Sequence, residues 1–429
     1  MTASVETLEG LSRRVTLNLN TALIEAEVGK RLQKIARTVR IDGFRVGKAP
    51  IKLVAARYGG EVRGEVLGEA LQQAFGSAVQ ENKLAVAGYP QFSSDEKGAF
   101  VATFEVFPDI QVGDLTQIKV TRPVVEVGDG DIDRTLEVLK KQRVHYQTVE
   151  REARTGDRVH LDYQGRIDDQ PFPGGEARDF PVILGEGRTL PDFEGSLAGM
   201  KTDETRTFDV TFPADYFAQE LAGKTATFEA TVKSVHEAQF PEIDTTFAAS
   251  LGVHEGGVVK LREEIADNLR REAKRRVLNK VKEQVLNGLL ETTQFEVPGG
   301  LVAMERRALM EKAVADLKAR GMKEADIKLN DAVFEPQAKR RVALGLLMDN
   351  IVNRQGIKID DAKVRALVDE FAQSYEDPAD VVGWYYQDPS RLKEARAMVL
   401  EEGVIDWVLG QAQVTDEPTP LEKIMGNAA

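Results

Sequence analysis

Residues 159–165 run Val-His-Leu-Asp-Tyr-Gln-Gly, and this stretch decides the fold predicted for the middle of the chain. Apolar and polar side chains alternate along it, which is typical of a strand with one buried face. The same alternation returns at 208–212 and 228–232, and prolines and glycines separate the runs. Residues 155–240 therefore predict one small, mostly β domain, long enough for a single core.

Two other kinds of sequence flank this β segment. Residues 1–112 alternate first as a strand does and then show helical spacing, which predicts an α/β domain. Residues 113–154 hold helix breakers and one short amphipathic run, and we interpret them as a connector. Residues 241–429 show helical periodicity, so we expect an all-α domain there. The fold class predicted for the whole chain is multidomain α+β.

A row of apolar residues marks the first helix of the C-terminal segment. Between 261 and 289 its members stand four apart, so the row winds slowly around one long helix. Asp360 is the predicted N-cap of a later helix. Residues 384–386, Trp-Tyr-Tyr, stand in a proline-bounded connection, and we expect them to fill a core between helices. From Pro418 onward periodicity is lost, which predicts a loose tail.

Composition limits what the chain can do. Its 429 residues suffice for about two to four domains at roughly 100–200 residues each. The absence of cysteine excludes disulfides, thiolate catalysis and cysteine metal sites. The first residues lack the basic and apolar regions of a signal peptide, and no apolar run of about 18 residues would span a membrane. A cytoplasmic location is the default expectation.

The net charge of −13 hides one strongly basic window. Residues 30–57 contain nine bases and a single acid, Asp42, which gives a local charge of +8. Such a patch attracts anionic phosphate, whereas the chain as a whole repels nucleic acid. The plainer alternative is a solvated helix face followed by a turn. The contrast in charge favours a binding surface.

The centre of this window is a loop, residues 43–50, with the sequence Gly-Phe-Arg-Val-Gly-Lys-Ala-Pro. Its two glycines permit backbone angles that other residues avoid, and its proline can begin the next helix. Phe44 has no obvious burial partner, and Arg45 offers a planar fork suited to phosphate or carboxylate. The loop therefore predicts an exposed anchor.

The pattern Gly-Phe-Arg-x-Gly-Lys-x-Pro is similar to the signature loop of the bacterial trigger factor family. The resemblance implies docking on the ribosome beside the exit tunnel, through a ribosomal protein and nearby rRNA. Phe44 and Arg45 would carry the docking, with Lys48 in support, while Val46 stands where the family often has lysine. The ribosome-binding residues that the resemblance implies are Gly43, Phe44, Arg45, Gly47, Lys48 and Pro50.

The β segment resembles the FKBP-type prolyl isomerases. The match rests on the order and spacing of five stretches, 159–165, 180–185, 190–194, 212–216 and 227–229. It implies an antiparallel β fold with a short helix, and peptidyl-prolyl cis-trans isomerase activity. The pocket residues that the resemblance implies are Tyr163, Phe172, Phe180, Leu190, Phe193, Tyr216 and Phe228.

Four of the matched positions carry further expectations. Phe193 holds the floor position, where many relatives have tryptophan, and Tyr216 would donate a hydrogen bond to the substrate carbonyl. Pro173 replaces an aspartate of single-domain relatives, which removes a polar group from the pocket. Asp192 replaces the usual glycine, which affects the short helix under the floor. The plainer alternative is that these aromatic residues only fill a β core. That alternative is reasonable for any single residue, but the whole set in this order favours a pocket.

Isomerisation of a prolyl bond suits an apolar pocket. Rotation about the bond faces a barrier of about 18–20 kcal/mol because the amide is conjugated, and the cis and trans forms differ little in energy. An apolar site disfavours the polar planar amide relative to its twisted state. No nucleophile, acid–base pair or cofactor is required. Residues 155–240 hold sixteen acids and eight bases, so we expect this domain to lie away from RNA.

The remaining sequence shows no further chemistry. The four histidines are scattered and no Walker-type motif occurs, so neither a metal site nor ATP use is expected. The resemblance to trigger factors covers essentially the whole chain. It implies that residues 241–429 form a central body with two helical arms that cradle unfolded chains, and that the connector packs with this body.

Three hypotheses follow. The first is an ATP-independent, ribosome-associated chaperone that holds nascent chains open, assists folding and export, and isomerises prolyl bonds. The second is a free cytosolic isomerase without ribosome docking, and the third is an RNA-binding adaptor that has lost catalysis. The basic loop separates the first from the second, and the aromatic set separates it from the third. The sequence leaves open the client range and whether the free protein is a monomer or a homodimer.

Overall fold

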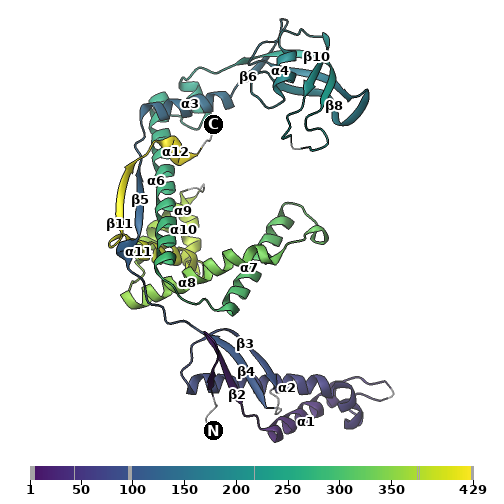
Figure 1. Ribbon diagram of the computed structural model, residues 1–429, viewed down its shortest axis with the longest axis vertical. Helices are drawn as coiled ribbons and strands as arrows, with labels where there is room; N and C mark the ends of the chain where they lie inside the picture. The colour runs from purple at the N-terminus through teal and green to yellow at the C-terminus, as the bar shows by residue number, and fades with distance from the viewer. Residues whose placement is uncertain are drawn as a thin grey trace. The chain divides into compact units, whose positions relative to one another are not determined.

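The computed structural model describes residues 5–42, 44–94, 99–216, 218–373, 375 and 377–426 (Figure 1). Two compact units make up the chain, Met1–Arg122 with Leu278–Glu417 and Pro123–Val277 with Pro418–Ala429. Each unit therefore combines two separate segments of sequence. The boundary between them falls inside the long helix α6 (Gly257–Thr292), which the apolar row predicted.

The N-terminal part of the first unit is a four-stranded antiparallel sheet with two helices. In spatial order the strands are β1 (Val5–Thr7), β2 (Ser12–Leu17), β4 (Phe100–Val106) and β3 (Val86–Ser94). Helix α1 (Thr21–Thr38) begins after Asn20, whose side chain accepts two backbone N–H groups of the first turn. Helix α2 (Ile51–Glu81) follows the basic loop. The α/β prediction is confirmed.

Helix α2 contributes to two cores along its length. Its first half, through Val54 and Val62, packs against α1. Its second half, through Leu71 and Ala78, packs against the sheet. The early packing fixes the start of α2 beside the end of α1, and this holds the two ends of the intervening loop close together.

Helices make up most of the rest of the first unit. They are α7 (Gly299–Ala319), α8 (Glu335–Gln355), α9 (Asp361–Ala372), α10 (Pro378–Gln387) and α11 (Lys393–Leu409), with short 3-10 turns at Leu115–Gln117, Glu324–Asp326 and Asp331–Phe334. Asp360 caps α9 by accepting two backbone N–H groups, as predicted.

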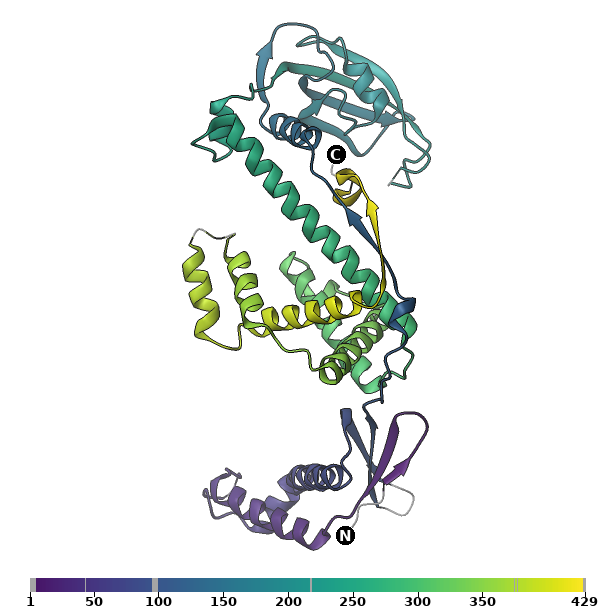
Figure 2. The ribbon, with the colours of Figure 1, turned by 90° about the vertical axis from the view of Figure 1, so that its left-hand side faces the viewer.

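One strand stands where only helix was expected. Strand β11 (Gln413–Pro418) pairs with β5 (Lys119–Val124), and Figure 2 shows β11 in yellow beside β5 in blue. Arg122 donates two hydrogen bonds to the Asp416 carboxylate, at 2.7 and 2.9 Å. The prediction of an all-α C-terminal segment is therefore wrong for these six residues. Their side chains are all exposed, so they lack the alternation that identifies a strand.

The prediction for residues 384–386 is wrong in two of three positions. They lie inside α10 rather than in a connection. Tyr385 packs against the core of α9 and α11, as expected. The side chains of Trp384 and Tyr386 are 51% and 43% exposed, and each lies beside an arginine, Arg391 and Arg365 respectively. These two rings therefore form apolar surface rather than core.

Gly113 lies against the end of α6. A Cβ atom there would be 2.0 Å from the Thr292 carbonyl oxygen, and the Gly113 N–H donates to the Thr293 hydroxyl at 3.0 Å. Because backbone blocks the added methyl group, we expect Gly113→Ala to lower the free energy of unfolding by about 1–3 kcal/mol. Urea unfolding measures this, with Gly345→Ala as control, since the space at that helical glycine is open. Equal stability of the two variants would contradict the close contact.

The second unit contains a five-stranded antiparallel sheet. Strand β10 (Thr225–Gln239) pairs along one edge with β7 (Arg158–Ile167), and along the other with β9 (Thr205–Thr211) and β6 (His145–Val149). Strand β8 (Gln170–Ile183) continues the sheet beyond β7, and helix α4 (Pro191–Leu197) packs on its core. The pairing of β6, from the predicted connector, favours a domain start before His145. The domain boundaries remain predictions.

The remainder of the second unit is helical. Helices α3 (Asp129–Gln142) and α5 (Thr245–Ser250) share a core with the first half of α6. Helix α12 (Leu421–Met425) completes this core, because Leu421 is buried in it. The loose tail predicted from Pro418 is therefore wrong as far as Met425. In the described part of the chain, no helix is long and apolar enough to cross a membrane.

Candidate functional site

The loop between α1 and α2 exposes the residues predicted to bind. The side chains of Phe44 and Val46 are 42% and 52% exposed, and Arg45 and Lys48 are exposed as well. The Lys48 N–H donates to the Arg45 carbonyl at 2.9 Å, which closes a turn. Gly43 lies outside the described residues.

Two residues of the loop shape its backbone. Gly47 has φ = +78°, a left-handed conformation that glycine adopts without a steric penalty. Pro50 occupies the N-cap position of α2, directly before its first residue. The predicted backbone role of Gly47 and the position of Pro50 at the start of the next helix are therefore present in the structure.

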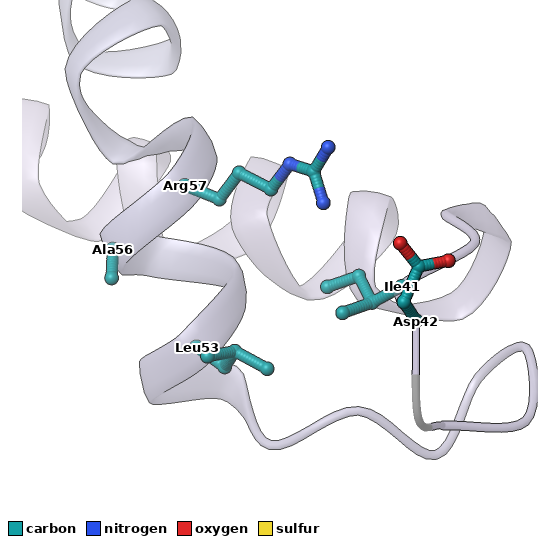
Figure 3. A pocket seen from close by; sticks show the side chains of 5 residues that line it. All are labelled: Ile41, Asp42, Leu53, Ala56 and Arg57. Carbon is teal, nitrogen blue, oxygen red and sulfur yellow. The ribbon is translucent and has the colours of Figure 1, made fainter.

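A hollow of about 360 Å³ lies next to this loop (Figure 3). Ile41, Leu53 and Ala56 give it an apolar lining, and Asp42 and Arg57 are its two charged residues. Asp42, the single acid of the basic window, thus lies at this hollow. The sequence did not predict this hollow, because its lining residues come from two separate segments. Ile41 and Asp42 lie between α1 and the loop, and the other three lie in the first turns of α2.

Two of the nine bases in the basic window form ion pairs with nearby acids. Arg31 binds the Glu69 carboxylate at 2.6 and 3.0 Å, and this hydrogen bonding raises the pKa of Arg31. Lys30 pairs with Glu27. Among the described residues, no ion pair involves the other seven bases, Lys34, Arg37, Arg40, Arg45, Lys48, Lys52 and Arg57. The uncompensated charge therefore lies nearer the loop than the sequence suggested.

The second candidate site is a pocket of about 310 Å³ in the second unit. All seven predicted residues line it. Tyr163 comes from β7, Phe172 and Phe180 from β8, and Phe228 from β10. Leu190 directly precedes α4, Phe193 lies within α4, and Tyr216 lies in the segment after β9. The sequence missed these lining residues: Gly174, Arg188, Thr189, Phe212, Ala218 and Leu221.

The missed residues differ in how much signal the sequence held. Phe212 ends an alternating run, so its burial was foreseeable although its place in the pocket was not. Ala218 and Leu221 lie in an irregular segment without periodicity. Nothing in the sequence could place them. Pro173, predicted as a departure within the pocket, does line it.

The aromatic rings of this pocket contact one another edge to face. The Tyr163 ring centroid lies 5.6 Å from that of Phe180, 5.5 Å from that of Phe193 and 5.8 Å from that of Phe228. Phe193 and Phe228 are 5.3 Å apart and almost fully buried. These two rings therefore belong to both the core and the pocket, so the two interpretations of the aromatic set do not exclude each other.

Gly165, the last residue of the stretch 159–165, keeps this cluster closed. A Cβ atom at Gly165 would lie 2.5 Å from the Phe228 ring. The glycine leaves room for the ring beside the β7 backbone, where a side chain would displace it. The fold-deciding stretch thus also shapes the pocket.

The pocket offers apolar surface and neutral hydroxyl groups. Burial, with a smaller effect from neighbouring Tyr216, raises the pKa of Tyr163, so its phenol is uncharged at neutral pH. Arg188 is the one charged group among the described lining residues. No cluster of three or more metal-ligating side chains occurs in the described part of the chain. The arrangement suits the binding of an uncharged, largely apolar peptide segment rather than acid–base catalysis.

Models of known protein families match three parts of the chain. Residues 1–139 match the family described as bacterial trigger factor protein, and residues 257–410 match its C-terminus. Residues 149–233 match the FKBP-type peptidyl-prolyl cis-trans isomerases.

Curated relatives match along the full length. The trigger factors of Aromatoleum aromaticum and Nitrosospira multiformis are 48% and 46% identical to this chain, each covering 100% of both chains. That of Burkholderia multivorans is 45% identical and covers 99% of both. The chain therefore belongs to the trigger factor family of ribosome-associated chaperones, and its middle domain is an FKBP-type peptidyl-prolyl cis-trans isomerase.

Proposed function

We propose that the chain docks on the ribosome through Phe44 and Arg45, and that the cations around them neutralise rRNA phosphates. The observation that carries this proposal is the exposed Phe44 beside bases that have no acidic partner in the described structure. An apolar ring supplies a hydrophobic anchor for a ribosomal protein, and the cations supply attraction to phosphate. Membership of the family does not favour a free isomerase.

The seven predicted pocket residues bind the prolyl segment in this proposal. Phe193 forms the floor, and the hydroxyl of Tyr216 donates a hydrogen bond to a substrate carbonyl. The edge-to-face rings favour the twisted amide because they surround it with apolar surface. The mostly apolar lining, in which Arg188 is the one charged group among the described residues, supports this assignment, since an amide in rotation carries no net charge to stabilise.

Exposed apolar side chains on the helices of the first unit would hold nascent chains. Trp384, Tyr386 and Met398 lie on α10 and α11, and Met304 lies on α7. Exposed apolar groups of this kind are typical of surfaces that bind partners. Binding through them needs no nucleotide. We place this activity in the cytoplasm, with part of the protein on ribosomes.

The salt dependence of docking tests the electrostatic part of the proposal. A few phosphate contacts predict that affinity falls on the order of tenfold between about 50 and about 200 mM salt. Co-sedimentation of the chain with ribosomes measures this fall. Lys52→Gln should make the dependence shallower, whereas Lys30→Gln should not, because Lys30 is already paired with Glu27. Identical slopes for the two variants would contradict the proposed role of the unpaired bases.

A further inference from the structure

Glu194 is a buried acid beside the aromatic pocket. It is the fourth residue of α4, and only 7% of it is exposed. The preceding residue, Phe193, faces the aromatic cluster. Burial of a carboxylate costs free energy unless hydrogen bonds compensate for it, so Glu194 must have partners of its own.

Those partners all come from residues 185–190, which we call the pocket loop. The Glu194 Oε2 atom accepts the N–H groups of Gly185 at 2.8 Å and Gly187 at 3.3 Å. Its Oε1 atom accepts the N–H of Thr189 at 3.1 Å and the Thr189 hydroxyl at 3.0 Å. One carboxylate therefore fixes three backbone positions of a segment without regular structure.

The backbone of the pocket loop is shaped for this contact. Gly185 and Gly187 have φ values of +90° and +67°, a backbone conformation that residues other than glycine rarely adopt. The left-handed turns bring successive N–H groups to one side, where Glu194 accepts them. Without the carboxylate these groups would be left without an acceptor in a partly buried place.

Four donors also keep Glu194 charged. Burial alone would raise the pKa of its carboxyl group. The N–H groups of Thr189, Gly185 and Gly187 and the Thr189 hydroxyl outweigh that effect and hold the pKa below its usual value. The contact is thus complete at neutral pH and weakens only as the pH falls through the lowered pKa.

The pocket loop carries one wall of the pocket. Arg188, Thr189 and Leu190 line it, while Phe193 lies one residue before Glu194 on α4. The carboxylate thereby couples the wall to the floor. A wall displaced by even about 1 Å would surround the twisted amide less closely, and misplacements of that size are costly to catalysis.

We propose that Glu194 is a positioning residue of the isomerase: it holds the pocket loop so that Leu190 stays aligned with Phe193. This inference rests on the proposed pocket and adds a residue that does not itself line it. The competing explanation is that Glu194 only stabilises the domain. The two differ in whether its effect on activity passes through Leu190.

The first experiment compares two buried carboxylates in the full chain. Glu194→Gln replaces two acceptor oxygens with one and places an amide N–H₂ against N–H donors. Asp157→Asn is the matched control, because Asp157 is also buried and also accepts a backbone N–H, from Arg154, but does not line the pocket. We expect kcat/KM for a prolyl peptide to fall about tenfold in Glu194→Gln and to stay within about twofold in Asp157→Asn.

A double-mutant cycle then separates positioning from stability. In a Leu190→Ala background, Glu194→Gln should lower kcat/KM by less than about twofold further, since the wall it holds is already lost. In a Phe180→Ala background it should still cost about tenfold, because Phe180 belongs to β8. Equal further losses in both backgrounds would overturn the proposal and favour a purely structural role.

A second pair of variants covers the case in which Glu194→Gln does not fold. Gly187→Ala strains the pocket loop backbone, and Gly199→Ala strains a turn after α4 at φ = +79°; an added Cβ meets open space at both sites. Only Gly187→Ala should lower kcat/KM, and an equal loss in both would overturn the proposal. If Phe193→Ala keeps full activity, the proposed pocket fails. If the Glu194→Gln and Gly187→Ala variants keep full activity while Phe193→Ala loses it, the proposed pocket stands and only this inference fails.

Discussion

Replacing Phe44 and Arg45 together with alanine should remove most of the binding of the chain to ribosomes. The exposed ring and the guanidinium group form the centre of the proposed contact, and residues of these types often contribute about 2 kcal/mol or more to an interface. Affinity should therefore fall by at least about thirtyfold. Co-sedimentation with ribosomes at low salt measures the loss.

A matched control tests whether the site, rather than the chemistry, is responsible. Replacing Tyr386 and Arg365 with alanine also removes an exposed aromatic ring and one positive charge, from α10 and α9. This variant should pellet with empty ribosomes as the unchanged chain does. If the Phe44 and Arg45 variant pellets equally well, the docking surface lies elsewhere.

Phe193→Ala should nearly abolish the acceleration of proline-limited refolding. The ring forms the centre of the aromatic cluster, so its loss opens the pocket floor and admits water to the amide. A loss of about 10- to 100-fold in kcat/KM corresponds to about 1.4–2.7 kcal/mol of transition-state stabilisation. Tyr216→Ala should act in the same direction, because it removes the proposed hydrogen-bond donor.

Loss of stability has to be separated from loss of the site in this experiment. Met200→Ala removes a fully buried side chain from the same core without touching the pocket lining. In both variants the free energy of unfolding should fall by about 2–5 kcal/mol. Only Phe193→Ala should lose activity under conditions where both are folded. Equal activities of the folded variants would remove Phe193 from the proposed site.

The sequence predicted those features that depend on local pattern. Alternation placed β7, β9 and β10, and the four-residue spacing placed α6, because burial of one face leaves a periodic trace. Capping chemistry placed the start of α9 at Asp360. The exposure of Phe44 followed from the glycines around it and from the lack of a periodic partner.

Other features depend on contacts between distant residues, and these left no local pattern. Arg31 is neutralised by Glu69 on the next helix, 38 residues away. On α10, Tyr385 faces the core while Trp384 and Tyr386 face solvent. A run of three residues is too short to show from sequence which side of the helix is buried. Glu194 looked like any acid of a short helix, since its donors are backbone groups that every sequence possesses.

The pairing of β5 with β11 has a consequence for how the protein is made. Arg122 and Asp416 are 294 residues apart, and synthesis proceeds at roughly 5–20 residues per second, so β5 waits roughly 15–60 s for its partner. The isomerase sheet lies entirely within residues 145–239 and can close as soon as β10 has emerged. We therefore expect two stages of folding. The isomerase sheet can form while later residues are still being added, whereas β5 can pair with β11 only after residues 413–418 have been made.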